Sequence, residues 1–75
     1  MNIKLWNQNN DFWYGKLVNN KFSIWDHQNR FIYGNLNGNK IQLWTESNKF
    51  IYGTLVGKQI NLYDEESNHI CGRVD

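Results

Sequence analysis

Apolar and polar side chains alternate along most of this chain, and short polar segments interrupt the alternation at regular intervals. Phe22 and Ile24 flank Ser23, and Ile41 and Leu43 flank Gln42, so the apolar positions recur every second residue. A period of two is typical of β-strands, whereas a helix has a period of 3.6. The apolar positions are also rich in Ile, Trp, Phe and Tyr, which favour strands. The pattern therefore predicts an all-β chain of short strands joined by turns.

The pattern repeats every 19 residues in four parallel series. The series are Trp6, Trp25, Trp44 and Tyr63; Gly15, Gly34, Gly53 and Gly72; Phe12, Phe31, Phe50 and His69; and Tyr14, Tyr33, Tyr52 and Cys71. The consensus unit reads apolar-x-Leu-Trp, a polar turn, then Phe-Ile-Tyr-Gly-x-Leu, and so holds two strands. The copies follow one another directly. We predict a single domain over residues 1–75, with repeats at about 2–20, 21–39, 40–58 and 59–75.

Two kinds of turn set the register of the predicted strands. The turn inside each repeat, such as residues 26–29, suits a type I turn followed by a left-handed Asn, and it pairs Asp26 with Arg30. The turns between repeats, such as Gly38-Asn39, suit two-residue hairpin loops of the primed types. Turn type fixes which residues lie opposite one another, so these turns place Trp25 opposite Phe31.

This register sorts the side chains onto two faces. The first face is apolar and is the predicted core: Ile3, Leu5, Trp13, Leu17, Phe22, Ile24, Ile32, Leu36, Ile41, Leu43, Ile51, Leu55, Ile60, Leu62, Ile70 and Val74, with the four repeated glycines. The second face carries ten aromatic residues, which we call the aromatic belt: Trp6, Phe12, Tyr14, Trp25, Phe31, Tyr33, Trp44, Phe50, Tyr52 and Tyr63. Polar residues such as Lys4, Lys16 and Arg73 share this second face, so we expect it to meet solvent or a partner.

The register also drifts by two residues in each repeat, because Trp25 pairs back to Tyr14 and forward to Phe31. Over four repeats the drift matches the shear of eight that closes an eight-stranded barrel at a strand tilt of about 36°. We therefore predict an eight-stranded antiparallel meander that forms a closed or nearly closed barrel with pseudo-fourfold symmetry. Closure would place Cys71 opposite Trp6. The alternative is an open flower of four hairpins with the core on its central axis.

The motif Tyr33-Gly34-x-Leu36 followed by Ile41-x-Leu43-Trp44 is similar to the hairpin units of the bacterial four-fold beta flower proteins, and the similarity covers the whole chain. That family has no established activity, so the resemblance implies a fold and a bacterial or phage source. The Trp-rich unit also resembles choline-binding cell-wall repeats. It lacks the Gly-Trp opening and the paired tyrosines of those repeats.

Composition narrows the choice of partners. The formal net charge is +1, which gives little long-range attraction for nucleic acid or an anionic membrane, so we do not expect nucleic acid as a partner. No apolar run approaches the roughly 20 residues of a membrane span, and residues 1–6 lack the apolar core of a signal peptide. We expect a cytoplasmic protein. Its one cysteine, Cys71, excludes an internal disulfide.

No group of residues predicts catalysis. His27 and His69 lie in different repeats, and no carboxylate or serine has the spacing of a triad. Cys71 has no sequence-local activator, so we interpret it as a small replacement for Tyr on the second face. Residues 64–66 are acidic, but a calcium loop needs more oxygen ligands at set spacings. We expect no enzyme, no metal site and no cofactor.

The aromatic belt is the strongest functional signal. Flat aromatic faces stack on sugar rings or bases, bind cations, or anchor protein interfaces. The alternative is that the rings only pair across strands, which stabilises a sheet by about 0.2–1 kcal/mol per pair. The belt predicts a non-enzymatic binding module for a glycan or another small ligand. It also suits a structural protein that self-assembles through the same residues. Tyr63, His69 and Cys71 depart from the consensus, so a fourth copy of the site would be weak or altered.

Overall fold

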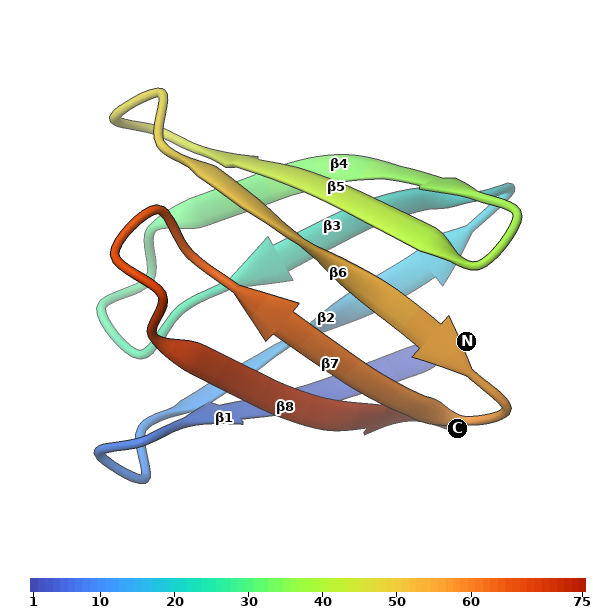
Figure 1. The fold of residues 1–75 in the computed structure, drawn as a ribbon, viewed down its shortest axis with the longest axis horizontal. Coiled ribbons are helices and arrows are strands. Elements are labelled where there is room, and N and C mark those ends of the chain that lie inside the picture. Colours follow the sequence, from blue (N-terminus) through green and yellow to red (C-terminus); the bar gives the residue numbers. More distant parts are fainter.

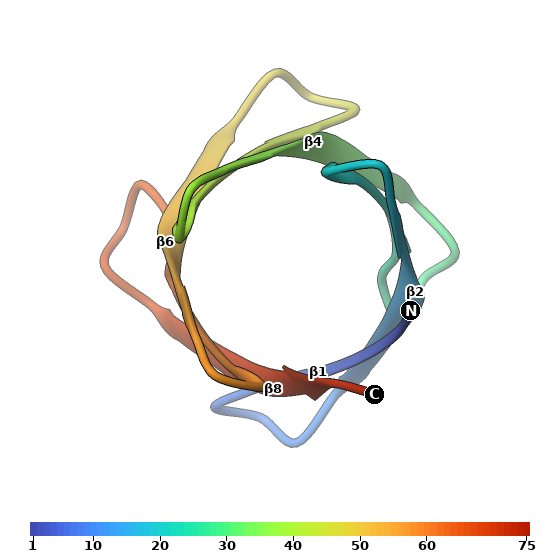
Figure 2. The same cartoon turned by 90° about the vertical axis from the view of Figure 1, so that its right-hand side faces the viewer.

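The computed structural model describes residues 1–75 as eight strands that close into one barrel. Each strand pairs with the next in antiparallel fashion, and the last pairs with the first (Figures 1 and 2). The eight-stranded meander is confirmed, and the barrel is closed rather than an open flower. The strands are β1 (Asn2–Asn7), β2 (Phe12–Val18), β3 (Lys21–Trp25), β4 (Phe31–Asn37), β5 (Lys40–Thr45), β6 (Phe50–Val56), β7 (Gln59–Tyr63) and β8 (His69–Val74).

The two ends of the barrel differ because their turns differ. The turns inside the repeats are wide and splay outward at one end, which we call the wide-turn end (Figure 1, left). Their fourth residues adopt positive φ: 63° at Asn10, 61° at Asn29 and Asn48, and 64° at Ser67. The tight turns and both chain termini lie at the other end, which we call the tight-turn end (Figure 1, right). There Asn19 and Asn20 have φ of 53° and 65°.

The observed register is the one that the turns predict. Trp25 lies opposite Phe31 across β3 and β4, and opposite Tyr14 across β2 and β3. The backbone N–H of Asp26 donates to the carbonyl of Arg30 over 3.0 Å, as a bulged turn requires. At the closing pair, Trp6 of β1 lies opposite Cys71 of β8. Closure therefore leaves no unpaired strand edge for another chain to extend.

The barrel interior is filled by aliphatic side chains with two large rings among them. The fourteen buried hydrophobic residues are Ile3, Leu5, Trp13, Leu17, Phe22, Ile24, Ile32, Ile41, Leu43, Ile51, Ile60, Leu62, Ile70 and Val74. The prediction that this face forms the core is confirmed. Leu36 and Leu55 pack against the same cluster but remain partly exposed.

The inward glycines let neighbouring strands approach one another closely. A Cβ on Gly34 would overlap the carbonyl oxygen of Gln42 and lie 2.7 Å from the Cα of Leu43, both on the next strand. Gly15, Gly53 and Gly72 occupy equivalent places against their neighbours. Real Cβ atoms do not approach backbone so closely, so only glycine permits this curvature in so small a barrel.

Candidate functional site

Most of the aromatic belt forms one continuous row of rings on the outer surface, which we call the aromatic ladder. Adjacent rings lie 5.0–6.4 Å apart between centroids. The row is continuous because β4 and β6 each carry two rings two residues apart, while Trp44 of β5 lies opposite Tyr33 on one side and Phe50 on the other. The ladder runs through Trp25, Phe31, Tyr33, Trp44, Phe50, Tyr52, Tyr63 and His69.

The ladder rings pack against one another and still face water. Tyr33, Tyr52 and Tyr63 are 45%, 46% and 42% exposed, and Trp25 is 38% exposed. Phe31, Trp44 and Phe50 are more covered by their neighbours, although none is buried. Cross-strand packing and solvent exposure therefore occur together on this surface.

His69 joins the ladder, although it was not among the predicted site residues. Its ring stacks on Tyr63 with centroids 5.0 Å apart and an interplanar angle of 26°. A ring nitrogen lies 3.3 Å from Oδ1 of Asn61. The signal was present in the sequence, because His69 occupies the position of Phe12, Phe31 and Phe50 in the 19-residue spacing.

The other three belt residues lie outside the ladder. Phe12 and Tyr14 are the most exposed rings, at 61% and 54%, and Trp6 is half-buried. Tyr14 lies opposite Trp25 in register, yet the two rings do not stack. The Tyr14 hydroxyl instead donates to Oδ1 of Asn29, 3.4 Å away in the next wide turn. The ring contacts of the belt therefore stop at Trp25, and Trp6, Phe12 and Tyr14 of β1 and β2 take no part in them.

A groove of about 990 Å³ lies over β1, β2 and β3, where the ring contacts stop. Tyr14 and Trp25 line it together with Lys4, Lys16 and Lys21. An equivalent groove lies 38 residues further along the chain, with Tyr52 and Tyr63 in the places of Tyr14 and Trp25, and it measures about 430 Å³. It is smaller, and in it the Tyr52 and Tyr63 rings are in contact, with centroids 6.3 Å apart.

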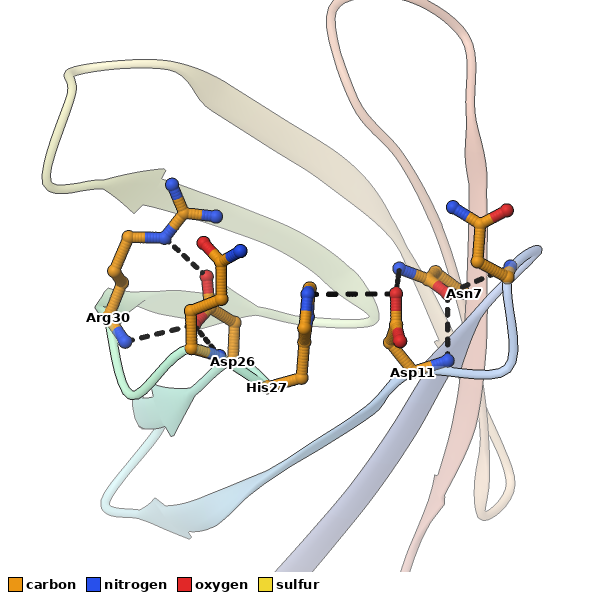
Figure 3. Close-up of polar contacts among 7 residues, drawn as sticks. Asn7, Asp11, Asp26, His27 and Arg30 are labelled. Carbon is orange, nitrogen blue, oxygen red and sulfur yellow. Dashed lines mark hydrogen bonds and ion pairs between the residues drawn. The ribbon is translucent and has the colours of Figure 1, made fainter.

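The acidic side chains of the wide turns hold the turns themselves. Oδ1 of Asp26 accepts hydrogen bonds from the backbone N–H groups of Gln28 and Arg30, and Oδ2 accepts one from the Arg30 guanidinium, each over 2.9 Å (Figure 3). Burial alone would raise the pKa of Asp26, but these hydrogen bonds and the nearby Arg30 charge outweigh it, so the pKa lies below 3.8. Oδ1 of Asp64 likewise accepts from the backbone N–H groups of Glu66 and Asn68, and Oδ2 accepts from the Asn68 amide. Burial again raises the pKa of Asp64, but these hydrogen bonds and the Lys49 charge outweigh it and lower the pKa.

Contacts between the wide turns link one repeat to the next. Oε1 of Glu46 accepts from the backbone N–H of Phe31 over 2.9 Å. Nε2 of His27 lies 3.7 Å from Oδ2 of Asp11 (Figure 3). Cys71 lies opposite Trp6. No group of three His, Cys, Asp or Glu side chains is arranged to hold a metal ion.

The chain contains no helix that could cross a bilayer. The resemblance to the four-fold beta flower proteins stays a prediction. No family model, curated protein or solved structure matches this chain.

Proposed function

We propose that this protein is a non-enzymatic binding module whose aromatic belt stacks on the flat faces of a glycan or another small ligand. The observation that carries the proposal is the ladder of half-exposed rings on the outer face. Tyr33, Tyr52 and Tyr63 each present close to half of their surface to water while a neighbouring ring supports them. Aromatic rings of this kind give large contact areas for the apolar faces of sugars.

The rings are also held in place before any ligand arrives. Each Tyr and Trp has only two side-chain torsions, and in the ladder each ring packs against a neighbouring ring. Phe31 and Tyr33 stack with an interplanar angle of 21°, and Phe50 and Tyr52 stack with an angle of 18°. Binding to a preorganised surface loses little side-chain entropy. Because the ladder repeats along the barrel, a ligand made of repeating units suits it.

A titration monitored by Trp fluorescence, supported by a glycan array, tests the proposal. We expect a saturable change with at least one glycan class, and we expect Tyr52→Ala to weaken the binding about tenfold, which is the effect of losing one stacked ring. Val56→Ala is the matched control, because Val56 is exposed on the same strand but lies outside the ladder. A flat response across broad ligand panels would contradict the proposal.

Self-assembly through the same belt is the second candidate. The favouring observation is the number of exposed rings: Phe12, Tyr14, Trp25, Tyr33, Tyr52 and Tyr63 are all exposed, and monomers seldom expose large apolar patches. Because the closed barrel has no free strand edge, such association would use side chains and not added strands. Sedimentation at micromolar concentration decides this: a single monomeric species removes the candidate.

A further inference from the structure

We propose that the groove over β1, β2 and β3 binds a phosphate-bearing ligand with a flat ring, which is the chemistry of a nucleotide. This inference rests on the proposed binding function and assigns a ligand class to one place on the belt. The same chemistry occurs in a free nucleotide and in a single nucleic-acid strand.

Three lysines line the groove, and none has a carboxylate partner. Lys4, Lys16 and Lys21 surround it, while the ion pairs of the structure lie in the wide turns. Asp75 is the one acidic residue in its lining. Three unpaired ammonium groups around one groove create a positive potential, and phosphate is a preferred ligand for lysine.

The barrel fold does not require lysine at positions 4 and 16. In the equivalent groove over β5, β6 and β7, Gln42 takes the place of Lys4 and Thr54 takes the place of Lys16. The strand pairing is the same, because Gln42 lies opposite Tyr52 as Lys4 lies opposite Tyr14. A barrel strand thus accepts neutral residues at these positions, so stability does not explain the lysines.

One of the lysines also faces a like charge. Lys4 lies opposite Arg73 where β1 pairs with β8. Like charges in direct cross-strand register destabilise a sheet, so this pair works against folding in the free protein. A bound anion next to Lys4 would offset that repulsion.

The charges of the whole barrel are segregated along its axis. Six of the seven acidic residues lie in the wide turns: Asp11, Asp26, Glu46, Asp64, Glu65 and Glu66. Only two of the eight basic residues lie there, Arg30 and Lys49. The net charge of +1 conceals this separation. An anionic ligand is therefore directed away from the wide turns and toward the lysines.

The rings supply the second half of the site. Tyr14 and Trp25 lie opposite each other on adjacent strands but do not stack, whereas their counterparts Tyr52 and Tyr63 are in contact. The groove between the unstacked rings has about 990 Å³, near the upper end of the roughly 300–1,000 Å³ of small-ligand sites. A base can stack on either ring while its phosphate meets the lysines, which is how single strands are held on aromatic surfaces.

The test compares two probes, ATP and a fluorescein-labelled eight-nucleotide oligo(dT), by calorimetry and fluorescence anisotropy with the intact protein. The variant Lys4→Gln/Lys16→Thr gives this groove the neutral residues that the equivalent groove has at these two positions, Gln42 and Thr54. We expect it to weaken binding of either probe about tenfold or more, since hydrogen bonds to charged groups are lost. The control Lys40→Gln/Lys58→Gln removes the same charge outside the groove and should stay within about twofold. Lys4→Gln alone should not lower the unfolding midpoint, because it also removes the repulsion from Arg73.

The outcomes separate the possibilities. Similar affinity for both probes points to a free nucleotide, and much tighter binding of oligo(dT) with a steep salt dependence points to a single strand. An equal loss in both double variants, or no binding of either probe at millimolar concentration, overturns the inference. If neutral glycans still bind when both phosphate probes fail, the proposed function stands without this ligand class. If no ligand of any kind binds, both proposals fail.

Discussion

The barrel predicts that a smaller side chain matters more for stability than its larger neighbour. Leu43 and Trp44 are adjacent on β5, but Leu43 is 0% exposed and faces the interior, while Trp44 lies on the outer ladder. We expect Leu43→Ala to cost more free energy of unfolding than Trp44→Ala. If size alone decided, the Trp variant would be the more damaging one.

The magnitudes follow from the surroundings of each residue. Leu43 lies opposite Ile51 and Gly34 in a fully enclosed interior, so its truncation leaves a cavity and should cost about 2–5 kcal/mol. Trp44 contacts the rings of Tyr33 and Phe50 at 6.4 and 5.5 Å. Trp44→Ala removes these two cross-strand pairs and should therefore lower the free energy of unfolding by about 0.4–2 kcal/mol.

Urea unfolding followed by circular dichroism measures both changes. A domain of this length has a total stability of roughly 4–11 kcal/mol, so Leu43→Ala can leave little folded protein. In that case Ile51→Val, at about 0.5–1.5 kcal/mol, gives a milder test of the same interior. If Trp44→Ala lowers the free energy of unfolding as much as Leu43→Ala does, the inward face does not contribute more to stability than the outward face, and the reasoning is refuted.

Three further changes test other parts of the fold. Gly53→Ala should lower the free energy of unfolding by about 3 kcal/mol or more, because a Cβ there would overlap the next strand. Gly57 lies in open space at φ of +61°, so Gly57→Ala should lower it by only about 1 kcal/mol. Equal urea midpoints for the two variants would contradict the close approach of the strands at Gly53. Asp26→Asn should cost about 1–2 kcal/mol at pH 7. Because the folded pKa of Asp26 lies below 3.8, this stabilisation is present above about pH 4 and is lost as the pH falls through the folded pKa. The difference from the parent protein should therefore narrow in acid, and a pH-independent difference would count against the ionised cap. Cys71→Tyr restores the consensus opposite Trp6 and should raise the free energy of unfolding by about 0.2–1 kcal/mol. A lower midpoint of thermal unfolding would contradict this.

The register could be derived from the sequence because local turn chemistry fixes it. The left-handed residue at Asn29 and the pairing of Asp26 with Arg30 follow from residues within one turn, and each turn then orders the strands on both sides. Since strand phase has a period of two, the same turns decide which residues face inward. Closure followed from the accumulated drift, which requires no knowledge of side-chain positions.

The end of the ring contacts at Trp25 could not be derived in the same way. Tyr14 and Trp25 have the sequence positions of a stacked pair, yet the Tyr14 hydroxyl bonds to Asn29 in a different repeat. Ring orientation depends on such contacts between repeats, and strand phase says nothing about them. The charge segregation was available in the sequence, because most acidic residues fall in the wide turns. It was hidden by the near-zero net charge.

The central claim is that the outward rings meet the ligand while the inward aliphatic residues only hold the barrel. Carbon-detected NMR with separate observation of aromatic rings and methyl groups, during titration with ATP, oligo(dT) and neutral oligosaccharides, tests it most directly. The account predicts that a binding ligand shifts ring signals such as those of Trp25 and Tyr14, while the methyl signals of Leu5 and Leu43 stay unchanged. Shifts confined to the interior methyl groups, or ring signals that respond to none of the ligands, would contradict it.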